Sequence, residues 1–226
     1  MPHTDLRSSP LEMSPDEFRK LGHQLVESIA GFLESLHHRP VNPAETPDQV
    51  RSLLGNTSLP MEGMDADKLL MRTSQLLYEH SLFNGHPAFF GYITSSAAPI
   101  GALGDLLAAS VNPNVGSFQL SPVATEIEAQ TIRWIAEMIG YPKECGGILV
   151  SGGNMANLVC FLVGRKMKMH WNTREEGIKG KMVRIYATQE THTWIKKAAD
   201  MFGFGTNAIR LIAADKQLRM DVKDLI

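Results

Sequence analysis

The chain has 226 residues, 43% of them hydrophobic, which is enough to bury a sizeable core as one large domain or slightly more. Its formal net charge of −2 leaves no basic excess, which argues against nucleic acid or an anionic membrane surface as the main partner. Two cysteines, Cys145 and Cys160, form no CxxC pattern, which excludes a disulfide framework and fits a reducing compartment. No apolar leader and no apolar run near ~18 residues occurs, so the sequence predicts no signal peptide, no membrane span and a cytoplasmic location.

The N-terminal third is predicted to form a set of helices. Residues 1–13 are expected to form a flexible lead-in. Ser14, Pro15 and Glu17 then give an N-cap, a proline at the first helical position and a capping-box glutamate, and apolar residues at steps of three and four predict a helix to about Leu36. A proline-rich hinge follows, and two further helices are expected over 48–54 and 65–80. Such helices either pack on a partner subunit or cover the chain's own core.

Residues 84–96, NGHPAFFGYITSS, combine glycine, proline and three aromatic rings. One interpretation is a loop whose aromatic side chains are buried in the core. The other is a loop that lines a pocket, with Tyr92 and Ser95 as polar tips on an apolar wall.

Two helices joined by an irregular loop are predicted next. Small and apolar residues favour a helix over 100–111, and the loop covers 112–120. Ser121 and Pro122 then begin a strong amphipathic helix, which Gly140 and the following Tyr-Pro end.

The stretch 146–157, GGILVSGGNMAN, predicts a short buried strand over 148–150, a glycine-bearing turn and the start of a helix. Such a turn presents free backbone N–H groups at the positive end of the helix dipole, which suits a phosphate. Small residues at strand-to-helix turns also occur for purely structural reasons, so the pattern alone leaves both interpretations open.

The remaining sequence alternates strands and helices. Strands are expected over 182–187 and 208–212, with a helix over 192–202 between them and another beginning at Asp221. Strands joined by helices predict a parallel α/β sheet with right-handed crossovers. Because three strands are few for this architecture and the last helix stops after one turn, the chain is expected to be cut rather than complete.

Four separated blocks carry a family resemblance: GHPAFFGYITSS, NPNVGSFQLSPVATEIE, GGILVSGGNMANL and YATQETHTWIKKAADMFG. With them the chain resembles the N-terminal part of the pyridoxal-phosphate-dependent group II decarboxylases, relatives of aromatic-L-amino-acid decarboxylase. The resemblance implies an incomplete α/β large domain of the aspartate-aminotransferase-like fold (fold type I) over 81–226. A helical dimerisation arm would precede it over 1–80.

The resemblance also implies roles for particular residues. Gly153 and Asn154 match the turn that holds the phosphate of pyridoxal phosphate, and His192 matches the histidine that stacks on its pyridine ring. Tyr92 and Ser95 become expected substrate contacts. Family members are homodimers with shared active sites, which would bring the loop 112–118 near the active site of the second subunit. No metal is expected.

Two family features have no match: the lysine that forms the Schiff base and the aspartate that pairs with the pyridine nitrogen of the cofactor. The lysine that forms the Schiff base follows a histidine in relatives, and no lysine of this chain follows a histidine. The resemblance therefore implies a decarboxylase of aromatic L-amino acids whose lysine lies beyond Ile226, supplied by a second chain or a missing C-terminal half. The alternatives are a glutamate or aspartate decarboxylase, an oxidative deaminase, and a non-catalytic piece that serves in dimerisation or binds a phosphate ligand.

Overall fold

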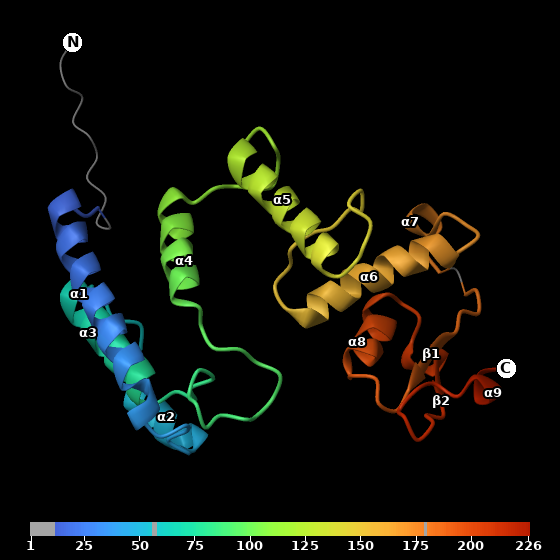
Figure 1. Cartoon of the computed structure of the whole chain (residues 1–226), viewed down its shortest axis with the longest axis horizontal. Helices are drawn as coiled ribbons and strands as arrows, with labels where there is room; N and C mark the ends of the chain where they lie inside the picture. The colour runs from blue at the N-terminus through green and yellow to red at the C-terminus, as the bar shows by residue number, and fades with distance from the viewer. Residues whose placement is uncertain (1–11, 56–57, 179) are drawn as a thin grey trace, which may run out of the picture. The chain divides into compact units, whose positions relative to one another are not determined.

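The computed structural model describes residues 12–55, 58–178 and 180–226 (Figure 1). The chain divides into two compact units, Met1–Asn112 and Pro113–Ile226, called here the N-terminal unit and the C-terminal unit. A flexible lead-in was expected over 1–13, and residues 1–11 of it lie outside the described residues.

The N-terminal unit is helical in its regular structure, as predicted. The side chain of Ser14 accepts a hydrogen bond from the N–H of Glu17 and begins α1, and the side chain of Asp65 begins α3 in the same way. Helices α1 and α3 pack side by side, with the rings of Phe32 and Tyr78 stacked at 4.5 Å between centroids (Figure 1). The helices of this unit are α1 (Pro15–Ser35), the 3-10 helix η1 (Leu36–His38), α2 (Pro47–Leu54), α3 (Ala66–Glu79) and α4 (Pro99–Val111).

The C-terminal unit contains the sheet. Strands β1 (Ile185–Thr188) and β2 (Ile209–Ile212) are parallel, in a register that pairs Ile185 with Ile209 and Thr188 with Ile212. The helix between them makes this a βαβ unit. The other elements are α5 (Pro122–Met138), α6 (Gly153–Lys168), α7 (Thr173–Glu176), α8 (Trp194–Met201), η2 (Thr206–Ala208) and α9 (Val222–Leu225).

The strand predicted over 148–150 was wrong. This segment has no strand partner among the described residues, and the sheet has two strands rather than three. The backbone N–H of Leu149 instead donates to Oε1 of Glu128 on α5, at 3.0 Å. An apolar run therefore lies in extended, unpaired form before α6, because a strand forms only where a neighbouring strand supplies the ladder.

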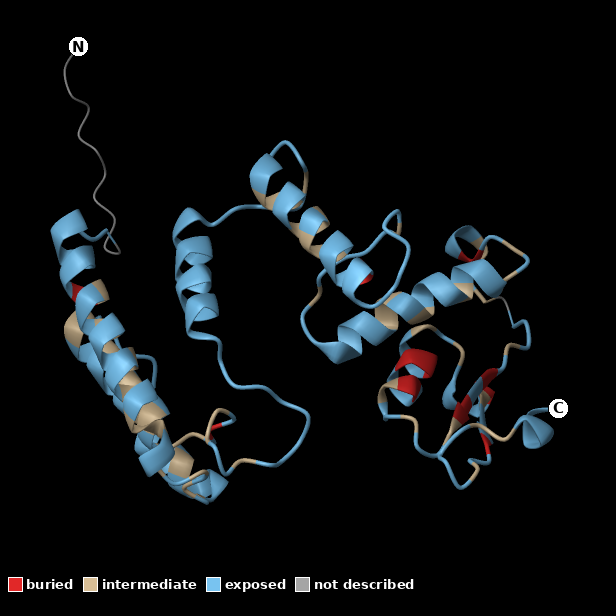
Figure 2. Ribbon diagram, in the orientation of Figure 1, coloured by how far each residue is buried: buried red, intermediate tan, exposed pale blue. Residues whose placement is uncertain are grey.

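The core of the C-terminal unit lies around the βαβ unit (Figure 2). Ala198 and Ala199 on α8 are 0% exposed, so the helix approaches the sheet closely at these two small residues. Ala199 belongs to a cluster of buried residues with Ile185, Ala187, Ile195 and Ala208, and Ile212 is also buried at the end of β2. This core fixes the two ends of β1 and the start of α8, which is where His192 lies.

Candidate cofactor-binding site

The turn before α6 has the geometry of an anion site. Gly152 has φ 85° and ψ 165°, a backbone conformation that is essentially restricted to glycine. No side chain caps the helix. Within the described parts of the chain, no acceptor is paired with the N–H groups of Gly153, Asn154 or Met155. Three donors at the positive end of a 16-residue helix are therefore available to a ligand.

The space around this turn is open as well. Residues 151–157 are exposed, and a Cβ placed on Gly153 would meet no atom within 4 Å. A phosphate needs both free donors and close access to the backbone, and this turn offers both. The residues present therefore fit the phosphate group that the sequence analysis assigned to Gly153 and Asn154.

His192 lies in the turn between β1 and α8. Its imidazole is exposed, and its Nδ1 accepts a hydrogen bond from the backbone N–H of Trp194 at 3.3 Å. Its carbonyl oxygen accepts from the N–H of Ile195, a core residue. The ring is thus held at one nitrogen, while Nε2 has no partner among the residues that the structure describes. This arrangement leaves a flat side chain available to a cofactor ring.

Aromatic packing joins the two elements that carry these residues. Phe161 of α6 meets the indole of Trp194 edge-on, with 6.0 Å between ring centroids. It also contacts Phe202 and Phe204, and the guanidinium of Arg165 lies 5.2 Å from the centroid of Phe202. Phe161 follows Gly153 by eight residues, which is about 12 Å of helix. The same packed pair of helices therefore carries the turn at Gly152–Asn154 and the turn at His192.

Tyr92 and Ser95 belong to the N-terminal unit, and both are exposed. Tyr92 has φ 57°, a left-handed conformation that is uncommon for a residue with a Cβ, and its ring lies 6.5 Å from that of Phe89. The structure brings Gly153, Asn154 and His192 together in one unit. The substrate role of Tyr92 and Ser95 stays a prediction.

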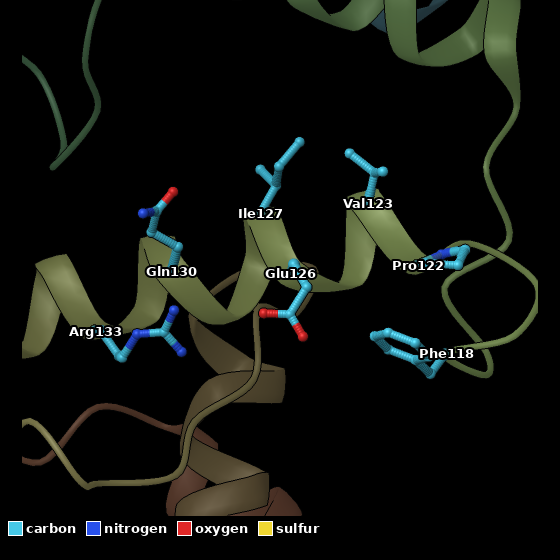
Figure 3. Close-up of a pocket in the computed structure, with 7 residues that line it drawn as sticks. All are labelled: Phe118, Pro122, Val123, Glu126, Ile127, Gln130 and Arg133. Carbon is cyan, nitrogen blue, oxygen red and sulfur yellow. The ribbon is translucent and has the colours of Figure 1, made fainter.

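A groove of the C-terminal unit lies elsewhere, along α5 (Figure 3). Its volume is about 340 Å³, and none of the predicted cofactor residues lines it. The lining is mostly apolar, with Glu126 and Arg133 as its charged members; the other residues are Phe118, Pro122, Val123, Ile127 and Gln130. An open groove along one helix lacks the convergent donors of the turn before α6, so chemistry and not size identifies the candidate site.

Two other features are absent from the residues that the structure describes: a metal-ligand cluster and a membrane-spanning helix. Among residues 12–55, 58–178 and 180–226, no group of three or more His, Cys, Asp or Glu side chains is placed to hold a metal ion. In the same residues, no helix has both the length and the apolar character needed to cross a membrane.

Sequence reasoning missed two contributors to this site. The hydroxyl of Thr191 and the backbone N–H of Trp194 both shape the turn that carries His192. A threonine beside a histidine has no distinctive signal in a sequence, and a backbone donor has none at all. Both become evident only in the folded structure.

The C-terminal unit has an α/β fold with a parallel pair of strands, and its turn before α6 fits an anionic group. Residues 47–226 match the family described as the pyridoxal-dependent decarboxylase conserved domain. The chain therefore belongs to the pyridoxal-dependent decarboxylases, whose cofactor is pyridoxal phosphate, and the predicted family is confirmed.

Several relatives match most of the chain. The aromatic-L-amino-acid decarboxylase of Bacillus atrophaeus is 30% identical over 218 residues, which are 96% of this chain and 44% of that protein. The phenylacetaldehyde synthase of Petunia hybrida is 29% identical over 209 residues, covering 90% of this chain and 41% of that protein. The chain thus spans less than half the length of these relatives.

Solved structures agree on the fold. The crystal structure of Oryza sativa TDC with PLP and tryptamine is 25% identical, with a TM-score of 0.82, and the match covers 96% of this chain and 46% of that one. The Catharanthus roseus tryptophan decarboxylase in complex with L-tryptophan also has a TM-score of 0.82 at 21% identity, which supports the fold alone. The structure is therefore part of a PLP-dependent decarboxylase fold.

Proposed function

We propose that the complete protein is a PLP-dependent decarboxylase of aromatic L-amino acids with an aspartate-aminotransferase-like (fold type I) large domain. The observation that carries this proposal is the open, donor-lined turn at Gly152–Asn154, in the same unit as His192 and inside the family match. We further propose the division into a helical dimerisation arm over 1–80 and a cofactor domain from residue 81.

In this proposal, the N–H groups of Gly153 and Asn154 hold the cofactor phosphate, and the imidazole of His192 lies against the pyridine ring. The helix dipole of α6 favours the phosphate charge without a basic side chain. The stacked imidazole orients the ring and excludes water from one face. Bound pyridoxal phosphate supplies the electron sink that lowers the barrier to loss of CO2 from an amino acid.

The Schiff-base lysine has no match among these 226 residues. We propose that it comes from sequence outside them, in the same protein or in a second chain, and that active sites are shared across a homodimer. The chain covers 44% of the Bacillus atrophaeus relative, which leaves room for such a segment. The isolated 226-residue chain is then expected to be inactive.

The substrate class rests on the named relatives. Several are decarboxylases of aromatic amino acids by name, including tyrosine decarboxylases of Petroselinum crispum. The Petunia relative is named for an aldehyde product, so oxidative release of an aldehyde is the second candidate reaction. Tyr92 and Ser95 are the residues of this chain proposed to contact the substrate.

A substrate panel tests this proposal. The complete protein with added pyridoxal phosphate is incubated separately with tryptophan, tyrosine, phenylalanine, histidine, glutamate and aspartate, and CO2, amine, aldehyde and peroxide are measured. We expect CO2 and the matching amine from an aromatic substrate. Turnover of glutamate or aspartate alone would reassign the substrate, aldehyde with peroxide would reassign the reaction, and no turnover at all would support a non-catalytic role.

His192→Ala in the complete protein tests the stacking residue. We expect turnover to fall roughly 100-fold, since a misplaced cofactor loses its alignment with the substrate. His170→Ala is the control, because His170 is also an exposed histidine of the C-terminal unit but lies before α7. Near-normal turnover in His192→Ala would show that the stacking role belongs to another residue.

A further inference from the structure

The turn that carries His192 is closed by the residue directly before it. The side-chain Oγ1 of Thr191 accepts a hydrogen bond from the backbone N–H of Thr188 at 3.1 Å, and the N–H of Thr191 donates to the carbonyl oxygen of Thr188 at the same distance. Thr188 is the last residue of β1, and both threonines are partly buried. The hydroxyl thus satisfies the final N–H of the strand and fixes the direction in which the chain leaves the sheet.

The other side of His192 is fixed by α8. The N–H of Ile195 donates to the carbonyl oxygen of His192, and Ile195 is buried in the core. His192 therefore has a hydrogen-bonded neighbour on one side and a core-anchored helix on the other.

The hydrogen bond to the ring also indicates which nitrogen of the neutral imidazole carries the proton. A backbone N–H can only donate, so Nδ1 of His192 must carry a lone pair when it accepts from Trp194. The neutral imidazole then carries its proton on Nε2, the nitrogen without a partner among the described residues.

We propose that Thr191 is a positioning residue for His192, and that the turn it closes holds the neutral imidazole as the Nε2–H tautomer with its ring presented to the cofactor. The relevance to catalysis rests on the proposed function, whereas the tautomer and its dependence on Thr191 belong to the protein without cofactor. The hydroxyl acts through the backbone of the turn and not by touching the substrate.

Nuclear magnetic resonance of histidine-labelled complete protein without cofactor tests the turn. The measurement is made near pH 8.5, about two units above the usual histidine pKa of about 6.5, so that histidines are largely neutral. We expect one set of His192 ring nitrogen signals, with Nδ1 unprotonated and Nε2 protonated. Thr191→Val should give signals of both tautomers, and Thr191→Ser, which restores a hydroxyl, should return the single set. A proton on Nδ1 in the wild type, or an unchanged spectrum in Thr191→Val, would overturn the proposal.

Turnover supplies the second readout. With pyridoxal phosphate and substrate, Thr191→Val should lower kcat roughly 10-fold while KM changes less than about two-fold, and Thr191→Ser should recover most of the loss. Thr125→Val is the matched control, because Thr125 is also partly buried and its hydroxyl also makes one backbone hydrogen bond, to Ser121. An equal fall in kcat for Thr125→Val would show a general stability effect. If the wild type has no decarboxylase activity, the proposed function fails while the tautomer result still decides the role of Thr191.

Discussion

The βαβ unit and helix α4 have similar apolar content but opposite burial. Around β1, α8 and β2, alanines and isoleucines are buried down to 0% exposed (Figure 2). Along α4, PIGALGDLLAASV, every residue is exposed, including Ile100 at 77% and Leu107 at 66%. The comparison shows that apolar residues and a helical period make a helix, whereas burial needs a second surface with a matching shape.

In most folded proteins, another part of the protein covers an apolar helix surface of this kind. The βαβ unit instead supplies its own cover, because the crossover helix lies on the sheet that it connects. The stability of the described chain should therefore depend on the βαβ unit and hardly at all on α4.

The largest expected effect compares two isoleucines. Ile195→Ala on α8 should lower the free energy of unfolding by about 2–5 kcal/mol, because it leaves a cavity in a core where Ile195 is 7% exposed. Ile100→Ala on α4 should change it by less than about 0.5 kcal/mol. Urea unfolding followed by circular dichroism measures both. An equal loss for Ile100→Ala would mean that α4 is covered in solution.

The turn before α6 gives the next effect. Gly152→Ala should cost about 1–3 kcal/mol, since its φ of 85° with ψ 165° suits only glycine. Gly153→Ala is the control, because a Cβ there meets nothing within 4 Å and the residue is helical. Its stability should stay unchanged or rise by up to about 1 kcal/mol. Calorimetry of the two variants checks the difference, and a loss in Gly153→Ala as large as that in Gly152→Ala would contradict the assigned geometry.

A smaller effect concerns the unpaired segment before that turn. Glu128→Ala removes the acceptor of the Leu149 N–H and should cost about 1 kcal/mol. Glu126→Ala, two residues earlier on α5, should cost less, because no donor among the described residues makes a hydrogen bond to the carboxylate of Glu126. Hydrogen exchange at Leu149 should speed up in Glu128→Ala alone. If exchange there is the same in both variants, the segment is held by something other than this carboxylate.

The smallest effect is a pH dependence at the exposed turn after β2. Hydrogen bonds from the backbone N–H of Arg219, and then from its side chain and from Gln217, hold the pKa of Asp215 below its usual value of 3.8. A lowered folded-state pKa stabilises the fold above pH 3.8, and this contribution is lost as the pH falls through the lowered pKa.

Asp215→Asn tests this contribution. The melting temperature of the variant should be slightly below that of the wild type at pH 7, and the two should converge as the pH falls below 3.8 through the lowered pKa of Asp215. The difference should shrink in salt, because the carboxylate is exposed. A gap that widens toward low pH would contradict the direction of the pKa shift.

The helices were predictable from sequence because their signals are local. Ser14 caps α1 as predicted, and α3 and α9 begin directly after Asp65 and Asp221, where the sequence predicts helix starts. The missing strand over 148–150 shows the limit of that approach. An apolar run indicates burial in a sheet, but pairing depends on a distant segment, and Leu149 pairs with Glu128 instead.

The residues of the candidate site also differ in how far the sequence alone predicts them. The turn and the helix start at 152–154 were predictable because glycines between an apolar run and a helical pattern favour a turn, whereas its phosphate role stays a prediction. His192 was recognisable only through family resemblance, since an isolated histidine before a helix is ordinary. The tautomer of its ring depends on a hydrogen bond from a backbone N–H. Because every residue except proline has such a donor, the sequence alone does not predict this tautomer.

The left-handed backbone of Tyr92 has one further consequence. A residue with a Cβ at φ 57° costs roughly 1–2 kcal/mol relative to an ordinary conformation, and glycine would remove that cost. Selection for stability alone would therefore favour glycine at this position. Tyr92→Gly would therefore relieve backbone strain and remove the aromatic ring at the same time, so its effects on stability and on turnover should have opposite signs if the ring contacts the substrate.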